Sequence, residues 1–342
     1  MKIAIHQNED SFCDRWIAYC EKHGVSYKLV DCYRSDIMDQ LSDCDGLMWH
    51  FNHKHSKDSK FAVQLLQAVQ ASGKKVFPDY YTAWHFDDKV AQKYLFEAIG
   101  APIAPSHVFY SKQEALAWTA TASYPTVFKT RNGSGSENVR LVRSGRQAAR
   151  LVKKAFGKGF KHYEAWGNLK ERLRKYRLGY TTLWNVTKGI IRLIYPTRYA
   201  RLTGREKGYI LFQDFIPGND SDIRIIVVGD KAFAIKRMVR KNDFRASGSG
   251  HVLYEKEHFS DETVSLSFEM AETLKSQCAA FDYVYADGRT YVLEISFGFV
   301  KEVYDPCTGY WDKDLTWHEG PFDPYGWMVE NLIKSIKEEQ KN

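Results

Sequence analysis

The 342-residue sequence lacks any long hydrophobic run, and this absence limits the classes of protein to consider. No apolar stretch reaches the roughly 18 residues of a membrane-spanning helix. The N-terminal residues MKIAIHQNED turn polar too soon for a secretion signal. We therefore expect a globular protein of two or three lobes that stays in the cytoplasm.

Cysteine is scarce, and the glycine fingerprint of dinucleotide-binding proteins is missing. The six cysteines are scattered without a C-x-x-C pair, which suits neither a disulfide framework nor a zinc site. No G-x-G-x-x-G follows the first predicted strand, residues 2–6. We expect reduced structural thiols and an N-terminal lobe that presents loops rather than a cofactor cradle.

Positive charge is concentrated in one segment rich in aromatic residues. Residues 158–208 hold 13 lysines and arginines against three acids, a local net charge of +10, whereas the whole chain carries +7. Such a patch favours anionic partners, and the interpretations left open are nucleotide, nucleic acid, acidic glycan, a lipid surface, or a solvated basic face. Aromatics between arginines suit stacking on sugars or bases.

The first 80 residues alternate between strand and helix patterns. Strands are predicted at 2–6, 26–33, 44–51 and 74–79, with helices at 11–24 and 61–73. This alternation is typical of βαβ units on a parallel sheet. We therefore predict a small doubly wound domain.

The remainder predicts mixed lobes. A helix from 87 ends at Gly100, and strands at 124–130 and 137–144 precede a helix at 145–157. The strands 208–216, 222–230 and 231–240 are predicted to form one sheet. A hairpin turning at Asp287-Gly288 and a closing helix from 324 complete the chain.

Two acids in this hairpin suggest a metal site. Asp282 and Glu294 lie on its two strands, and carboxylates brought face to face repel each other unless a cation lies between them. Mg²⁺, with Mn²⁺ as an alternative, prefers hard oxygen ligands completed by phosphates and water. The pair therefore predicts a magnesium site next to a phosphate ligand.

Candidate phosphate-binding residues lie earlier in the chain. Lys129 ends an apolar strand directly before a glycine-serine turn that contains Gly133, Ser134 and Gly135. Such a turn frees backbone N–H groups for phosphate oxygens, and the lysine supplies positive charge beside them. Lys89, which opens the preceding helix, is a second candidate cation.

A strand that breaks at Pro217-Gly218 offers a purine-sized site. Gln213, Asp214, Phe215 and Ile216 combine backbone hydrogen-bonding groups with apolar walls. The following strands carry cations suited to phosphoryl oxygens. These and the acid beside them are Asp222, Arg224, Lys236, Arg237 and Arg245, the last preceding the glycine-rich ASGSGH.

In this order the stretches resemble the ATP-grasp superfamily, most closely its RimK-like carboxylate-amine ligases. They are Asp88-Lys89 with LFEAIGAPIAPS, then VFKTRNGSGSENVRLV, then the segment from FQDFIPG to RASGSG, and AAFDYVYADGRTYVLEIS. The resemblance implies an α/β protein with α+β lobes in the ATP-grasp fold. It implies an N-terminal domain at 1–80, a small lobe at 81–210 with the basic insert, and a large lobe at 211–342.

The resemblance also implies roles for the residues. Lys89 and Lys129 match phosphate-contacting lysines, and Gln213 through Ile216 match the hinge that holds adenine. Asp222 and Lys236 fall among the nucleotide-binding positions, and Arg224, Arg237 and Arg245 match arginines at the triphosphate or acyl-phosphate. Asp282 and Glu294 match the magnesium carboxylates. Ser296 stands where the family commonly has asparagine as a third ligand, which leaves the number of ions open.

The implied reaction is ligation through an acyl-phosphate. A substrate carboxylate attacks the γ-phosphorus of ATP, and an amine then displaces phosphate. The acceptor is an amino acid or, through the basic insert, an acidic glycan as in surface-polysaccharide synthesis, with peripheral membrane contact and a homodimer as further expectations. The alternatives are a kinase-like phosphotransferase and a non-catalytic nucleotide- or nucleic-acid-binding protein, with nucleic acid disfavoured as a partner.

The histidines His50, His53 and His55 follow the third predicted strand. Loops at the carboxyl ends of parallel strands bind ligands in open α/β sheets. Three interpretations stay open for this cluster: a zinc site, contact with the acceptor substrate, and a solvated loop.

Overall fold

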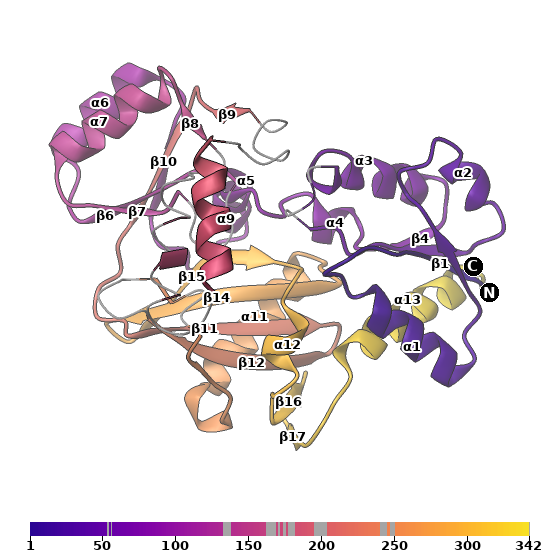
Figure 1. Cartoon of the computed structure of the whole chain (residues 1–342). Coiled ribbons are helices and arrows are strands. Elements are labelled where there is room, and N and C mark those ends of the chain that lie inside the picture. Colours follow the sequence, from indigo (N-terminus) through magenta and orange to yellow (C-terminus); the bar gives the residue numbers. More distant parts are fainter. Residues whose placement is uncertain are drawn as a thin grey trace. The chain divides into compact units, whose positions relative to one another are not determined.

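The computed structural model divides into two compact units (Figure 1). Unit 1 comprises Met1–Phe86, Phe96–Pro102 and Gly218–Asn342, and unit 2 comprises Asp87–Leu95 and Ile103–Pro217. The structure describes all residues except 53, 54, 56, 133–137, 162–168, 170, 171, 174, 175, 177–181, 195–203, 240–244, 247–249 and 342, and it leaves out the side chains of 192–194. The three-part division expected from the sequence remains a prediction.

The N-terminal part of unit 1 is a parallel sheet with helices, as predicted. The strands are β1 (Ile3–His6), β2 (Tyr27–Val30), β3 (Gly46–Met48) and β4 (Lys75–Phe77), in the order β2-β1-β3-β4. The helices are α1 (Cys13–His23), α2 (Ile37–Gln40), α3 (Asp58–Ala71) and α4 (Tyr80–Ala83). All four residues of β1 are buried, as expected of a central parallel strand covered on both faces.

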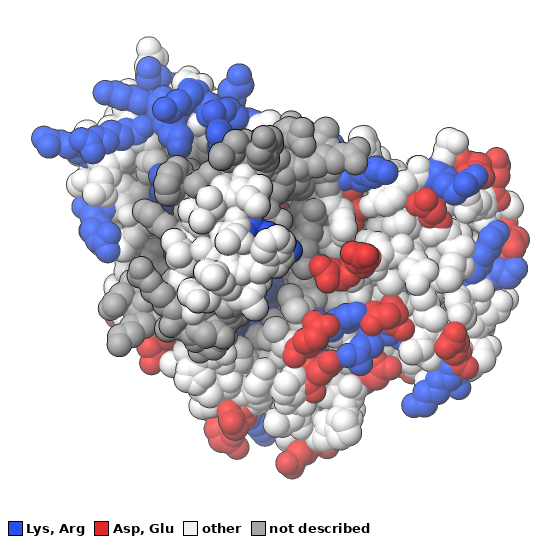
Figure 2. Space-filling model, viewed as in Figure 1, with Lys and Arg blue, Asp and Glu red and all other residues white. Residues whose placement is uncertain are grey.

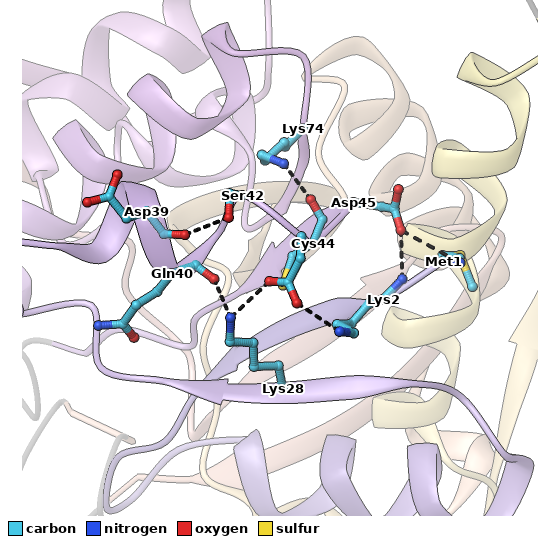
Figure 3. Close-up of polar contacts among 10 residues, drawn as sticks. Met1, Lys2, Lys28, Asp39, Gln40, Ser42, Cys44, Asp45 and Lys74 are labelled. Carbon is cyan, nitrogen blue, oxygen red and sulfur yellow. Dashed lines mark hydrogen bonds and ion pairs between the residues drawn. The ribbon is translucent and has the colours of Figure 1, made fainter.

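Lysines tie the loops together at the amino ends of these strands (Figure 3). Lys2 Nζ and Lys28 Nζ lie 2.8 and 2.9 Å from the two oxygens of Asp43, and these hydrogen bonds lower the pKa of that carboxyl. Lys74 Nζ donates to the Cys44 carbonyl at 2.5 Å. These ion pairs are exposed, and such pairs contribute little to stability. We assign this edge a structural role, which leaves the carboxyl edge for ligands.

The second sheet of unit 1 is antiparallel. Its strands are β11 (Ser221–Val228), β12 (Lys231–Met238), β13 (Val252–Leu253), β14 (Cys278–Ala286), β15 (Arg289–Ser296), β16 (Gly309–Asp312) and β17 (Trp317–Glu319). The order is β15-β14-β11-β12-β16-β17, with β13 beside β12. Asp287 and Gly288 turn the β14-β15 hairpin with positive φ values of 52° and 70°, as the Asp-Gly pair predicts.

One hydrophobic core joins the two sheets of unit 1. Ile226, Phe233 and Ile235 from the antiparallel sheet share it with β1, β3 and the closing helix α13 (Pro324–Glu339). The remaining helices of this unit are η1 (Lys256–His258), α11 (Asp261–Thr273) and α12 (Lys301–Tyr304). All six cysteines are free and buried in the structure.

Unit 2 is built on a four-stranded antiparallel sheet. Its strands are β5 (Ser106–Phe109), β6 (Thr126–Lys129), β7 (Arg140–Val142) and β10 (Ile210–Asp214), in the order β5-β10-β6-β7. The described helices are α6 (Lys112–Thr121), α7 (Gly145–Ala155), α9 (Leu183–Ile194) and α5 (Lys89–Ala98), through which the division between the units passes, and β8 (Phe160–Lys161) pairs with β9 (Arg205–Glu206). Within the described ranges, no helix has the length and apolarity needed to cross a bilayer.

The predicted three-stranded sheet is wrong in one respect. β10 pairs with β5 and β6, whereas β11 and β12 pair with each other in unit 1. Pro217 and Gly218, with φ of 83°, end the strand and redirect the chain. An apolar strand pattern shows only that a strand forms, since its partners are set by long-range packing. The helix α6 and the strands β16 and β17 were not predicted.

Candidate functional site

Five charged residues lie on one face of the antiparallel sheet of unit 1. Glu294 on β15 is opposite Asp282 on β14, which is opposite Arg224 on β11, and Asp222 on β11 is opposite Arg237 on β12. Opposed residues of an antiparallel ladder project to the same face. The sheet therefore brings together side chains that are up to 72 residues apart in the sequence, Asp222 and Glu294.

Four of them form what we call the ion-pair cluster: Asp222, Arg224, Arg237 and Asp282. Arg237 donates from Nε and Nη2 to the two oxygens of Asp222 at 2.6 and 2.8 Å. Its Nη2 also lies 2.9 Å from Asp282 Oδ2, and Arg224 Nε lies 3.1 Å from Asp282 Oδ1. All four side chains are at most 17% exposed. The cluster is thus a nearly enclosed charged network.

Both arginines of the cluster stay protonated. Burial disfavours the charge on Arg237, but the carboxylates of Asp282 and Asp222 outweigh burial and raise its pKa well above the ordinary value. The same opposition between burial and Asp282 raises the pKa of Arg224. Burial raises the pKa of Asp222, against the opposing effect of Arg237. With all three acids ionised, three carboxylates and two guanidinium groups carry a formal charge of −1, which a cation would offset.

The predicted metal ligands Asp282 and Glu294 are brought together, but Ser296 is engaged elsewhere. The Ser296 hydroxyl donates to the Gly298 carbonyl at 3.0 Å and accepts from the Gly298 N–H at 3.1 Å. Asp282 Oδ1 is buried and has no aligned hydrogen bond in the described part of the chain. The Asp282 and Glu294 carboxylates, opposite each other on β14 and β15, fit one Mg²⁺ completed by phosphate and water.

A bulge in β15 lies beside this carboxylate pair. Asp282 pairs with Glu294 and Tyr283 pairs with Val292, so that Leu293 is an extra residue in its strand. Bulges bend a strand and re-aim the neighbouring side chain, and they are frequent near active sites. The bulge therefore sets the direction of Glu294 in a way the sequence did not indicate.

Among the described residues, no set of three or more acids, histidines or cysteines is arranged to hold a metal.

Lys236, one of the predicted cations, lies on the opposite face of the sheet from the ion-pair cluster. Lys236 is opposite Ile223 and directly precedes Arg237 on β12, so the alternation of a strand sends it to the other face of the sheet. Arg245 lies beside the buried Ala246, with undescribed residues on either side of the two. The structure does not bring Lys236 into the cluster.

In unit 2, Lys129 begins a chain of hydrogen bonds. Its Nζ donates to Gln213 Oε1 at 2.6 Å, and Gln213 Nε2 donates to Ser106 Oγ at 3.0 Å. Ser106 in turn donates to the Ala104 carbonyl at 2.8 Å. Gln213 is buried in the central strand β10, so this chain fixes the lysine at the end of β6. The predicted Gly133, Ser134 and Gly135 lie outside the described residues.

Lys89 is tied to the chain just after Lys129. The Lys89 N–H donates to the Arg131 carbonyl at 2.9 Å, and Arg131 Nε donates to Asp88 Oδ2 at 2.7 Å. The other oxygen of Asp88 accepts from the N–H groups of the first turn of α5. The Lys89 side chain is only 6% exposed, with Nζ 3.5 Å from Asp87 Oδ1. Unit 2 thus brings the two predicted phosphate-binding lysines into one connected segment.

The predicted adenine hinge divides into two parts. Gln213 and Asp214 lie within β10, where Thr126 Oγ1 donates to the Gln213 carbonyl at 2.7 Å and the Asp214 N–H donates to Pro105 at 2.8 Å. Phe215 and Ile216 follow the strand, directly before the division between Pro217 and Gly218. The role of Gln213 through Ile216 in holding adenine remains a prediction.

His50 is a core residue. It is 4% exposed, its ring stacks on Phe12 with centroids 3.6 Å apart, and its Nδ1 accepts from the Phe12 N–H at 3.1 Å. The solvated-loop interpretation is therefore wrong for His50, since its ring packs against Phe12, Phe297 and Gly298. His53 lies outside the described residues.

A polar cluster at the carboxyl edge of the parallel sheet was missed by the sequence analysis. Buried Asp58 accepts from the Tyr33 hydroxyl and, at 2.9 Å, from the Asn52 N–H. His6 Nδ1 accepts from the Cys32 N–H at 3.1 Å, and His6 Nε2 is buried without a hydrogen bond in the described part. Each of these residues ends a strand, follows one, or begins the next helix, and this position was the available signal.

Comparison with known proteins identifies part of this architecture. Residues 198–302, which contain most of the ion-pair cluster's sheet, match the RimK-like ATP-grasp domain. The match includes all four residues of the ion-pair cluster and Glu294. No curated protein sequence matches the chain.

Solved structures extend the likeness over the chain. The D-alanine–D-alanine ligase from Bacillus anthracis, complexed with ATP, has a TM-score of 0.57 at 12% identity, covering 99% of both chains. An ATP-grasp RimK domain protein from Sphaerobacter thermophilus has a TM-score of 0.55 at 14% identity, covering 97% of this chain and all of the other. The ligase PsnB, with minimal precursor, Mg and ADP, has 0.55 at 13%, covering 98% of both. The predicted ATP-grasp fold is confirmed.

Proposed function

We propose that this RimK-like ATP-grasp protein is an ATP-dependent carboxylate-amine ligase. A carboxylate oxygen of one substrate attacks the γ-phosphorus of ATP, and the bond to the ADP oxygen breaks. The amine nitrogen of a second substrate then attacks the acyl carbon. The bond between the acyl carbon and the phosphate oxygen breaks, phosphate leaves with the electron pair, and the amine loses a proton. The observation that carries the proposal is the ion-pair cluster with Glu294 within the matched ATP-grasp domain.

The residues have separate tasks in this proposal. Lys89 and Lys129 neutralise phosphate oxygens, and Phe215 and Ile216 hold the adenine. Arg224 and Arg237 stabilise charge on the transferred phosphoryl group, since protonated guanidinium groups fixed by carboxylates need no reorganisation. Asp282 and Glu294 would hold Mg²⁺, which supplies charge neutralisation on the phosphates.

The acceptor site is proposed at the carboxyl edge of the parallel sheet of unit 1. There the buried Asp58 accepts from the Asn52 N–H and the buried His6 accepts from the Cys32 N–H, while His6 Nε2 and Trp49 Nε1 have no hydrogen bond in the described part of the chain. Unsatisfied buried polar atoms are costly and mark positions where a ligand can bind. An amino acid or the acid group of a sugar supplies the complementary oxygens. We further propose that the protein acts in the cytoplasm and forms a homodimer.

The test is a screen of amino acids and uronic acids, each with an amine donor, for ADP release. Glu294→Gln and Lys129→Met are expected to abolish substrate-dependent release, while Glu272→Gln and Lys153→Met, on exposed helix surfaces, retain it. All four variants are checked for folding by circular dichroism. Absence of Mg-ATP binding by calorimetry to the folded wild type would remove the enzyme proposal.

A trapping experiment separates the ligase from a kinase-like phosphotransferase. Hydroxylamine converts an acyl-phosphate into a hydroxamate, so the ligase gives a hydroxamate with the active carboxylate substrate. A stable phosphorylated product without hydroxamate would favour the phosphotransferase. Tight binding of RNA or DNA without any ATP dependence would favour the non-catalytic alternative.

A further inference from the structure

The helix α9 of unit 2 presents an apolar stripe to solvent. Leu183 and Trp184 are 58% and 62% exposed, and Ile190 and Ile191 are 50% and 52% exposed. Ile190 lies two turns after Leu183, and Ile191 lies two turns after Trp184. This spacing places all four residues on one side of an α-helix. Single exposed hydrophobic residues are ordinary, but a stripe along one helix indicates an interaction surface.

The other side of α9 anchors it to unit 2. Val186 is 4% exposed, and Arg172 Nη1 donates to the Asn185 carbonyl at 2.9 Å. Gly189 lies so close to the Arg172 side chain that an added Cβ would be 2.9 Å from its Cδ. The helix is therefore fixed through one side, and the apolar stripe is turned outward.

A basic surface accompanies the apolar stripe on unit 2. Residues 138–161, which include α7, contain eight lysines and arginines and no acid. Six of them are exposed: Arg143, Arg146, Arg150, Lys153, Lys158 and Lys161. Figure 2 shows the blue residues gathered over α6 and α7, with the mainly white α9 turned to the same side. One side of unit 2 thus combines an apolar helix with positive charge.

We propose that unit 2 docks on an anionic lipid surface, with α9 lying in the plane of the interface. An in-plane helix inserts its apolar side at the level of the acyl chains, and lysines and arginines attract anionic headgroups. Three of the four stripe residues are aliphatic. Nucleic acids bind through aromatic stacking platforms, whereas aliphatic side chains gain by leaving water for a bilayer. This proposal goes beyond the ligase activity and does not depend on ATP.

Vesicle flotation of the full chain tests the proposal without nucleotide. The chain is expected to float with vesicles of phosphatidylglycerol and phosphatidylcholine, and to float at least tenfold less with phosphatidylcholine alone. Leu183→Glu is expected to reduce binding to the anionic vesicles about tenfold. Phe61→Glu, at a site of equal exposure on α3 of unit 1, is expected to bind like the wild type.

Charge and apolar contributions are then separated. Arg146→Glu combined with Arg150→Glu is expected to weaken binding and its salt dependence, while Lys337→Glu on α13 has no effect. Failure of the wild type to float would overturn the proposal, as would equal binding by Leu183→Glu. Loss of a dimer in Leu183→Glu by light scattering would assign the stripe to a second copy, and salt-sensitive RNA binding that Leu183→Glu leaves intact would assign the basic surface to nucleic acid. Each of these two outcomes overturns the lipid proposal.

Discussion

Arg237 and Asp222 face each other across β12 and β11 as a two-point ion pair, with N–O distances of 2.6 and 2.8 Å. The pair fixes the plane of the guanidinium group, and this leaves Nη2 also 2.9 Å from Asp282. A planar arginine fork held by two carboxylates is preorganised for an anionic ligand. Asp222 is thus a positioning residue for Arg237.

Asp222→Asn is expected to lower the free energy of unfolding by about 3 kcal/mol, because a buried guanidinium loses one charged partner. The exposed Asp230, which pairs with Lys231 at 2.8 Å, provides the control. Asp230→Asn is expected to change stability by less than about 0.5 kcal/mol. Urea denaturation of both variants measures the difference. Similar losses of unfolding free energy in the two variants would show that the buried ion pair of Asp222 does not stabilise the fold more than an exposed one.

Gln213→Glu is expected to weaken ATP binding about tenfold, which corresponds to about 1.4 kcal/mol. The new carboxylate would lie beside Lys129 Nζ, now 2.6 Å from Gln213 Oε1, and would offset its charge. Isothermal titration calorimetry gives the affinity, and a thermal melt gives the stability. Gln147→Glu at the start of α7 is the matched control. Unchanged affinity in a folded Gln213→Glu protein would separate Lys129 from the phosphates.

Gly298→Ala is expected to destabilise unit 1 by about 1 to 3 kcal/mol, because overpacking forces neighbouring groups apart. The added Cβ would lie 2.8 Å from His50 Nε2. His50→Ala should relieve the clash, so the double variant is expected to be more stable than the sum of the single changes predicts. Chemical denaturation of the four proteins completes the cycle. If the two single changes in unfolding free energy add up to that of the double variant, the added Cβ does not clash with His50.

Ser296→Asn is expected to increase the affinity for Mn²⁺ in the presence of ADP. The asparagine side chain is longer than that of serine, and its amide oxygen is a better metal ligand than a hydroxyl. The Ser296 hydroxyl is also engaged with Gly298 at 3.0 and 3.1 Å. Electron paramagnetic resonance counts free and bound Mn²⁺ without any activity measurement. Ser335→Asn in α13 serves as the control. Equal Mn²⁺ binding by wild type and Ser296→Asn would argue against a metal position beside Ser296.

Burial lowers the pKa of His85 to about 4, and this predicts a loss of stability in mild acid. In the unfolded chain the pKa is about 6.5, so the unfolded state binds more protons between these two values. Stability is then complete above pH 6.5 and falls toward pH 4, by about 2 kcal/mol at pH 5. His85→Phe should remove this part of the pH dependence in urea denaturation. A ring titration near pH 6.5 by NMR would contradict the prediction.

The sequence by itself determined the elements and the class of fold. The period-2 and helical patterns located the strands β1–β4 and β10–β12 and the helices α1, α3, α7 and α13, because apolar spacing and Gly or Pro breaks act locally. The Asp-Gly turn located the hairpin that carries Asp282 and Glu294, whereas the bulge at Leu293, which no local pattern indicated, set these two residues opposite each other. The ordered motifs also indicated the ATP-grasp fold.

Only the tertiary structure decided which strands pair and what each charged side chain contacts. β10 joined β5 and β6, Asp222 paired with Arg237, and Ser296 turned to Gly298. Strand partners far apart in the sequence are selected by burial of whole faces, which no local pattern encodes. Likewise, His50 became a core residue because Phe12, Phe297 and Gly298 cover it. Helix α9 shows its apolar stripe because its buried side packs on Arg172 and Leu169.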